Sequence, residues 1–241
     1  MAHTTPYSGF LNRFGIFRSE VFMEHSKINS LNIYILNRPG HAAMHPVTGK
    51  RVEPVHFVMI IEEELFKALA SVVGFSDGYE KHMISMSRFS GDHNVSLDDL
   101  RLYRLGDSID SQMMHIFAES FVNSLDMIFR WIRLSDKTIS GMNDFLLKYA
   151  AIMEIVKDIR DSIAHSDERN RGLGKNKKPI TDQLQIHGNL RGDILQITTA
   201  DKIVRELPIN LQIFNMVCSI VEEYFRLYKW EGMKAKAWWC C

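Results

Sequence analysis

The feature that most constrains this chain is a long stretch of apolar residues at helical spacing, residues 108–134. This stretch contains no proline and no glycine. Its large apolar side chains recur every three or four positions, as on one face of an amphipathic helix. They are Ile109, Met113, Ile116, Phe117, Phe121, Leu125, Ile128, Phe129 and Ile132. At ~1.5 Å per residue the pattern predicts a helix about 40 Å long, which needs other helices to cover its apolar stripe.

Other segments with the same periodicity supply those helices. They are residues 55–73, 142–166 and 211–228. Residues 74–78 begin and end with glycine and are expected to break the first of these helices. The sequence Ser96-x-x-Asp99 resembles a capping box and predicts the start of a short helical turn. Pro208 is expected in the first turn of the last helix. The short connection at residues 135–141 favours an antiparallel pair of helices in a bundle.

A different pattern precedes the last helix. Short alternating apolar runs at residues 183–190, 193–199 and 202–206 surround Gly188-Asn189 and Arg191-Gly192-Asp193, which predicts a small β-hairpin or meander. The expected fold class is therefore mainly α, a helical bundle with a small β-hairpin before the last long helix. We expect a mixed region over residues 1–95, with a short strand near residues 31–36, then a helical domain over 96–231 and a tail over 232–241.

Composition limits the classes of protein to which the chain can belong. The 241 residues are 46% hydrophobic, and 29 basic side chains balance 29 acidic ones. A balanced charge excludes a protein that coats nucleic acid through its overall positive field. No apolar run approaches the ~18 residues of a membrane helix, and the polar amino terminus does not resemble a signal peptide. We therefore expect a cytoplasmic protein with no membrane partner.

No metal or cofactor is predicted. The three cysteines, Cys218, Cys240 and Cys241, lack the spacing of a zinc site. The Gly172-Leu173-Gly174-Lys175 stretch lacks the spacing and the preceding strand of a nucleotide-binding phosphate loop.

The residues with the clearest chemical potential lie near the end of the predicted 142–166 helix. They form the sequence Ile159-Arg160-Asp161-Ser162-Ile163-Ala164-His165-Ser166. Arginine presents a planar, permanently charged donor fork that suits a phosphate, and histidine titrates near neutral pH. Asp161 and His165 lie at i and i+4, where the carboxylate can orient the imidazole. Arg160 and His165 lie ~140° apart around the helix axis and do not share a face.

This arrangement resembles the RX4-6H motif of the HEPN superfamily, in which a polar residue directly follows the arginine. The resemblance covers the motif itself and, more loosely, residues 108–230. In the family the histidine is often followed by glycine, where this chain has Ser166. The resemblance implies a HEPN-like helical bundle and a metal-independent endoribonuclease of the toxin-antitoxin or antiphage type. It also implies a homodimer with a composite active site, and a possible antitoxin or regulatory partner.

By that resemblance Arg160 would stabilise charge on the phosphate and His165 would transfer a proton, with Asp161 as the third catalytic residue. RNA would be guided to them by a hydroxyl and by a basic segment that follows the motif. The candidate RNA-binding residues are Ser162, Arg169, Arg171, Lys175, Lys177 and Lys178.

Less specific interpretations of the same residues stay open. The motif can be a solvated last turn of a helix, where cations favour the helix dipole, and the basic segment can be a solvated connection. A helical serine such as Ser162 usually bonds its own backbone. A HEPN-like domain without catalysis, which binds RNA or a nucleotide, is the first alternative function. An interaction protein whose helices serve to dimerise or hold another protein is the second.

Overall fold

The computed structural model describes residues 43–44, 51–52, 54–89, 97–135, 137–165, 188–199 and 202–228. Helices make up 74% of this part of the chain. Two strands of two residues each, β1 (Ala43–Met44) and β2 (Arg51–Val52), pair antiparallel and precede the first described helix. The expected strand near residues 31–36, the basic residues of 169–178 and the tail over 232–241 lie outside the described residues.

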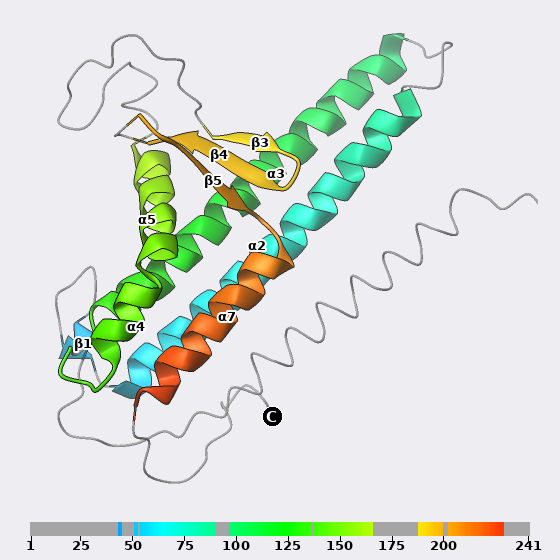
Figure 1. Ribbon diagram of the computed structural model, residues 1–241. Coiled ribbons are helices and arrows are strands. Elements are labelled where there is room, and N and C mark those ends of the chain that lie inside the picture. Colours follow the sequence, from blue (N-terminus) through cyan, green and yellow to red (C-terminus); the bar gives the residue numbers. More distant parts are fainter. Residues whose placement is uncertain are drawn as a thin grey trace, which may run out of the picture.

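Two long helices form the spine of the molecule. Helix α2 (Pro54–Phe89) and helix α3 (Leu97–Arg133) pack antiparallel along their length (Figure 1). The prediction that residues 74–78 break the first helix is wrong, because α2 continues through Gly74 and Gly78. A Cβ atom on Gly74 would lie 2.5 Å from the ring of Phe117, and one on Gly78 would lie 3.0 Å from Cγ of Met114. Because these glycines have no side chain, α2 and α3 can approach each other closely at both positions.

Helix α3 is also longer than predicted. It begins at Leu97, directly after the Ser96 of the capping-box sequence, and continues without interruption to Arg133. The expected short turn and the expected helix of residues 108–134 are one element. Gly106 lies inside it, and nothing lies within 4 Å of the position that its Cβ would take.

The predicted helix of residues 142–166 is divided at Tyr149. Helix α4 (Met142–Lys148) ends there and helix α5 (Ala150–Ala164) begins, with the backbone of Tyr149 at φ −106° and ψ 7°. Glu223 of the last helix holds this corner, because its carboxylate accepts hydrogen bonds from Lys148 Nζ and, at 2.6 Å, from the Tyr149 hydroxyl. Helix α5 then crosses α3 at an angle (Figure 1).

A three-stranded antiparallel meander follows, as predicted. Strands β3 (Asn189–Arg191), β4 (Ile194–Thr198) and β5 (Val204–Pro208) are hydrogen-bonded in the order β3-β4-β5. The sheet packs on α5. Pro208 is the last residue of β5 and not part of the first helical turn. Instead, the side chain of Asn210 caps helix α7 (Leu211–Arg226) by accepting a hydrogen bond from Ile213 N at 3.1 Å.

One apolar core joins these elements. It contains Leu65 and Val72 of α2, Phe121 and Phe129 of α3, and residues of α5, of the sheet and of α7. The predicted apolar stripe of α3 is only partly in this core. Ile109, Met113 and Ile116 are 53%, 40% and 56% exposed, so the helix has a buried apolar face and, toward its amino-terminal half, a second apolar face on the surface.

Candidate functional site

Helix α5 carries the motif residues because its apolar side chains fix how it packs. Met153, Val156 and Ile159 are buried against the rest of the core, as their three-residue spacing requires for one face of a helix. Arg160 comes directly after Ile159 and so lies at the edge of the buried face. Its side chain reaches α3, while the helix ends four residues later at Ala164.

Arg160 is held by two carboxylates. Its Nε donates a hydrogen bond to Oδ2 of Asp126 on α3 at 2.9 Å, and its Nη1 lies 3.0 Å from Oδ1 of Asp161. The side chain of Arg160 is 24% exposed. Two ion pairs restrict the guanidinium to one position, and its partial exposure leaves it in contact with solvent.

Asp126 is the centre of a larger ionic cluster. Its side chain is only 5% exposed, and two more arginines of α3 contact it. Arg130 Nε lies 2.7 Å from Oδ2, and Arg133 Nη2 lies 3.5 Å from Oδ1. Burial raises the pKa of Asp126 above its ordinary value, while the charges of Arg160 and Arg133 act in the opposite direction. We define the Asp126 cluster as Asp126, Arg130, Arg133, Arg160 and Asp161.

The sequence interpretation did not include Asp126, Arg130 or Arg133. A signal was present, because Asp126 interrupts the apolar pattern between Leu125 and Ile128, where a buried position is expected. A charged residue at such a position requires a partner of opposite charge. Arg130 follows at i+4, the spacing of an ion pair on one helix face.

His165 directly follows Ala164, the last residue of α5. It lies at the C-cap with its side chain exposed, and its backbone N–H donates to the Asp161 carbonyl at 3.2 Å. The Asp161 carboxylate, which was expected to orient the imidazole, contacts the Arg160 guanidinium. The Arg160 side chain contacts α3, while His165 lies at the exposed carboxyl end of the helix.

Ser162 has a different environment from the one expected of a phosphate donor. It is 1% exposed, and its hydroxyl donates to the Asp158 carbonyl at 2.7 Å. This is the common backbone bond of a helical serine. A hydroxyl in this position is not accessible to RNA. The other candidate RNA-binding residues, Arg169, Arg171, Lys175, Lys177 and Lys178, lie outside the described residues.

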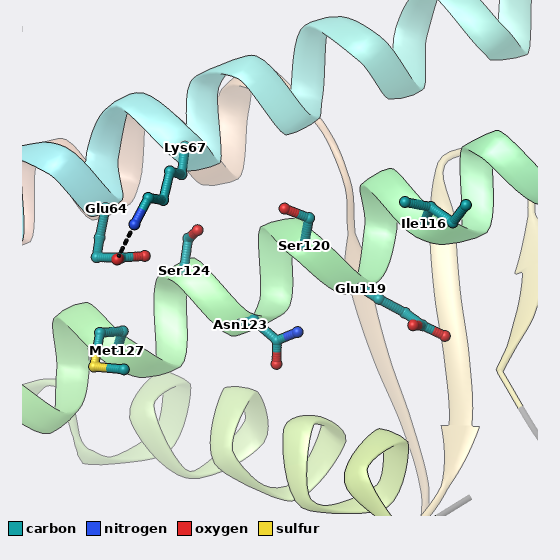
Figure 2. A pocket seen from close by; sticks show the side chains of 8 residues that line it. All are labelled: Glu64, Lys67, Ile116, Glu119, Ser120, Asn123, Ser124 and Met127. Carbon is teal, nitrogen blue, oxygen red and sulfur yellow. Dashed lines mark hydrogen bonds and ion pairs between the residues drawn. The ribbon is translucent and has the colours of Figure 1, made fainter. Parts of the chain in front are cut away.

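A groove with a volume of about 370 Å³ lies between α2 and α3 (Figure 2). Glu64 and Lys67 of α2 line one side, and their side chains form an ion pair at 2.8 Å. Residues from Ile116 to Met127 of α3 line the other side. The groove carries two carboxylates, those of Glu64 and Glu119, against the single cation of Lys67. This charge balance does not favour a phosphate, in contrast to the Asp126 cluster.

In the part of the chain that the structure describes, no group of three or more His, Cys, Asp or Glu side chains is placed to hold a metal ion. No described helix is both long enough and apolar enough to cross a membrane. No family model, no curated protein and no solved structure matches the chain.

Proposed function

We propose that this protein is a HEPN-type, metal-independent endoribonuclease. The observation that carries the proposal is the position of Arg160, whose guanidinium is fixed by the buried Asp126 carboxylate and still reaches solvent. A catalytic arginine needs both properties, because a donor that is already oriented costs no reorganisation when charge develops on a phosphate. His165 supports the proposal because it is exposed at the end of the same helix.

In the proposed reaction the RNA 2′-hydroxyl attacks its adjacent phosphate. A base, assigned to His165, takes the proton of the 2′-hydroxyl as the new P–O bond forms. The P–O5′ bond then breaks, and the leaving 5′-oxygen takes up a proton from water, which gives a cyclic phosphate and a 5′-hydroxyl. Arg160 stabilises the negative charge on the phosphate oxygens during this displacement. Asp161, in contact with Arg160 Nη1, keeps the arginine in place.

The proposed enzyme is a homodimer with a composite site. Arg160 and His165 lie ~140° apart around the axis of α5, so a second copy that faces this helix can supply the complementary residue. The exposed apolar side chains of Ile109, Met113 and Ile116 provide a surface for such pairing. The proposed setting is the cytoplasm, in toxin-antitoxin or antiphage defence with an antitoxin or regulatory partner.

The alternative is a HEPN-like protein that binds RNA or a nucleotide, or pairs with another protein, without catalysis. It is favoured by one observation, the use of two of the three Arg160 nitrogens in ion pairs with Asp126 and Asp161. An arginine bound in this way also stabilises the packing of α5 on α3 with no part in a reaction.

Cleavage of single-stranded RNA by the purified protein tests the proposal. We expect cleavage to persist in EDTA and to fall about 10²-fold or more in His165→Ala, the usual range for removal of a general acid or base. Arg160→Ala is expected to have a similar effect. His115→Ala on α3 is the matched control, because it removes a histidine of the described chain that the proposed site does not include.

Two results would contradict the proposal. One is the absence of cleavage across RNAs of varied sequence and structure, and the other is unchanged cleavage in both His165→Ala and Arg160→Ala. Loss of cleavage in EDTA would refute the metal-independent mechanism alone. In cells, expression of the wild type should be toxic and expression of His165→Ala should not.

A further inference from the structure

The Asp126 cluster contains more positive charge than its carboxylates neutralise. Three arginines, Arg130, Arg133 and Arg160, contact the single carboxylate of Asp126, and Asp161 contacts only Arg160 among them. The cluster therefore has three cations against two anions when both carboxylates are ionised. An excess of guanidinium groups at a partly exposed position favours the binding of an anion.

The three arginines differ in how many of their donors are in use. Arg133 directs Nη2 to Asp126 and Nη1 to the Met153 carbonyl, at 3.5 and 3.3 Å, so it links α3 to α5. Arg130 contacts Asp126 through Nε alone, and Arg160 uses Nε and Nη1. Within the described ranges, no hydrogen bond or ion pair engages either Nη of Arg130 or Nη2 of Arg160.

The two arginines with unused donors are neighbours. The Nε atoms of Arg130 and Arg160 both contact one oxygen, Oδ2 of Asp126, at 2.7 and 2.9 Å. Their guanidinium groups must therefore lie beside one another, although they come from different helices. The two side chains are 29% and 24% exposed, so a ligand in solvent can reach them. The buried carboxylate fixes both before any ligand binds.

We propose that Arg130 and Arg160 together bind one phosphodiester group of the RNA backbone, with Asp126 as the positioning residue that holds both. This inference rests on the proposed function, since it adds a second arginine to the same site. A phosphodiester has two non-bridging oxygens, and each can accept hydrogen bonds from one guanidinium. Arg130 thereby becomes a substrate-binding residue outside the Arg160 to His165 motif.

Binding of a fluorescein-labelled, single-stranded 2′-O-methyl RNA, measured by fluorescence anisotropy, tests this site. The probe has no free 2′-hydroxyl at its internal phosphates and is not a substrate of the proposed reaction. We expect Arg130→Ala to weaken binding about tenfold at low salt and to lower the slope of log K against log [salt] by about one. Arg226→Ala on α7 removes an equal charge from a side chain that is 75% exposed, and should change the affinity less than twofold.

A second variant, Arg130→Gln, shows whether weaker binding comes from the lost charge or from a loss of folded structure. Glutamine can still donate to Asp126 but has no charge, so it should weaken binding as Arg130→Ala does while the melting temperature stays near that of the wild type. Unchanged binding in both Arg130 variants would overturn the inference, as would an equal loss in Arg226→Ala. Inorganic phosphate should displace the probe from the wild type more effectively than chloride at the same ionic strength, because it offers the same oxygens to the two arginines. Displacement by phosphate that is unchanged in Arg130→Ala would overturn the inference.

The two proposals fail in different ways. A protein that binds the probe through Arg130 but cuts no RNA contradicts the proposed nuclease function alone. A protein that cuts RNA through His165 and binds the probe equally well without Arg130 contradicts the two-arginine site alone.

Discussion

Glu62 shows how strongly one residue of the core can respond to pH. The carboxylic acid lies on α2 and is 2% exposed. Burial raises its pKa from the ordinary 4.5 to about 8, because the charged form loses its hydration. The folded protein therefore keeps Glu62 protonated at pH values where the unfolded chain has already lost this proton.

The sign of the pH dependence follows from that difference. Below pH 4.5 both states are protonated and Glu62 imposes no penalty on folding. Between pH 4.5 and about 8 only the unfolded state ionises, so Glu62 lowers the free energy of unfolding by about 1.4 kcal/mol per pH unit. Glu62→Gln is expected to match the wild type near pH 4.5 and to be more stable at pH 8, by roughly 4 kcal/mol.

Urea unfolding at several pH values measures this effect. The control is Glu63→Gln, because the neighbouring side chain is 65% exposed and bonds Lys67 at the surface. We expect less than about 0.5 kcal/mol of pH-dependent change in the control. Equal pH profiles for the wild type and Glu62→Gln would contradict the assignment of a buried, protonated acid.

Individual residues also show which parts of the site a sequence can reveal. The short sequence from Arg160 to His165 is local, so residue type and spacing were enough to select it. Asp126 and Arg130 lie about thirty positions earlier, on another helix, and nothing local relates them to Arg160. Their association depends on how α5 packs across α3, which is a property of the tertiary fold. For the same reason, the inaccessible hydroxyl of Ser162 became evident only from its burial.

At the level of elements, periodicity predicted which segments are helical but not where the helices end or which face is buried. Intrinsic propensity alone predicts that Gly74 and Gly78 break the helix. Packing between α2 and α3 outweighs the low helix propensity of glycine, since both glycines lie where the two helices approach closely. Likewise, the spacing of Ile109, Met113 and Ile116 matches a buried stripe, and only the packed structure shows that they are exposed.

The packing role of Gly74 leads to a prediction at this level. In Gly74→Ala the new methyl group would lie 2.5 Å from the Phe117 ring, and such overpacking costs about 1 to 3 kcal/mol. The higher helix propensity of alanine returns about 1 kcal/mol, so we expect a net loss of roughly 1 kcal/mol in the free energy of unfolding.

Gly106→Ala is the matched control, because it makes the same change in α3 at a position with nothing within 4 Å. It should stabilise the protein by about 0.5 to 1 kcal/mol. Chemical denaturation of the two variants measures the difference between them. Equal stabilisation of both would show that α2 and α3 do not approach closely at Gly74.

For the whole molecule, the exposed apolar side chains of α3 are the surface on which the proposed second copy would pack. Ile109, Met113 and Ile116 begin a series with alternating spacings of four and three residues. The series continues through Ser120, Asn123, Met127 and Arg130. This is the spacing with which one helix packs against another, and it is maintained on a surface that other described elements leave at least partly exposed. Because it passes through Arg130, pairing along this face would bring a second copy close to the Asp126 cluster.

Oligomeric state provides the first check of that pairing. Size-exclusion chromatography with light scattering should show a dimer for the wild type at micromolar concentration and a monomer for Ile116→Glu, since the substitution places a charge in the apolar part of the interface. Leu147→Glu on α4 is the control, because Leu147 is 79% exposed and does not belong to the exposed series on α3. It should remain a dimer. A wild-type monomer, or equal effects of both substitutions, would contradict pairing through α3.

A composite site requires that residues from two copies act together, and mixing two inactive variants tests this requirement. If Arg160 of one copy acts with His165 of the other, a heterodimer of Arg160→Ala and His165→Ala keeps one intact site out of two. Half of the dimers in an equal mixture are such heterodimers, so the mixture should recover about a quarter of wild-type cleavage. If both residues act within one chain, neither subunit is complete and the mixture stays inactive. Recovery that also disappears with Ile116→Glu in both subunits would connect the exposed face of α3 directly to the catalytic site.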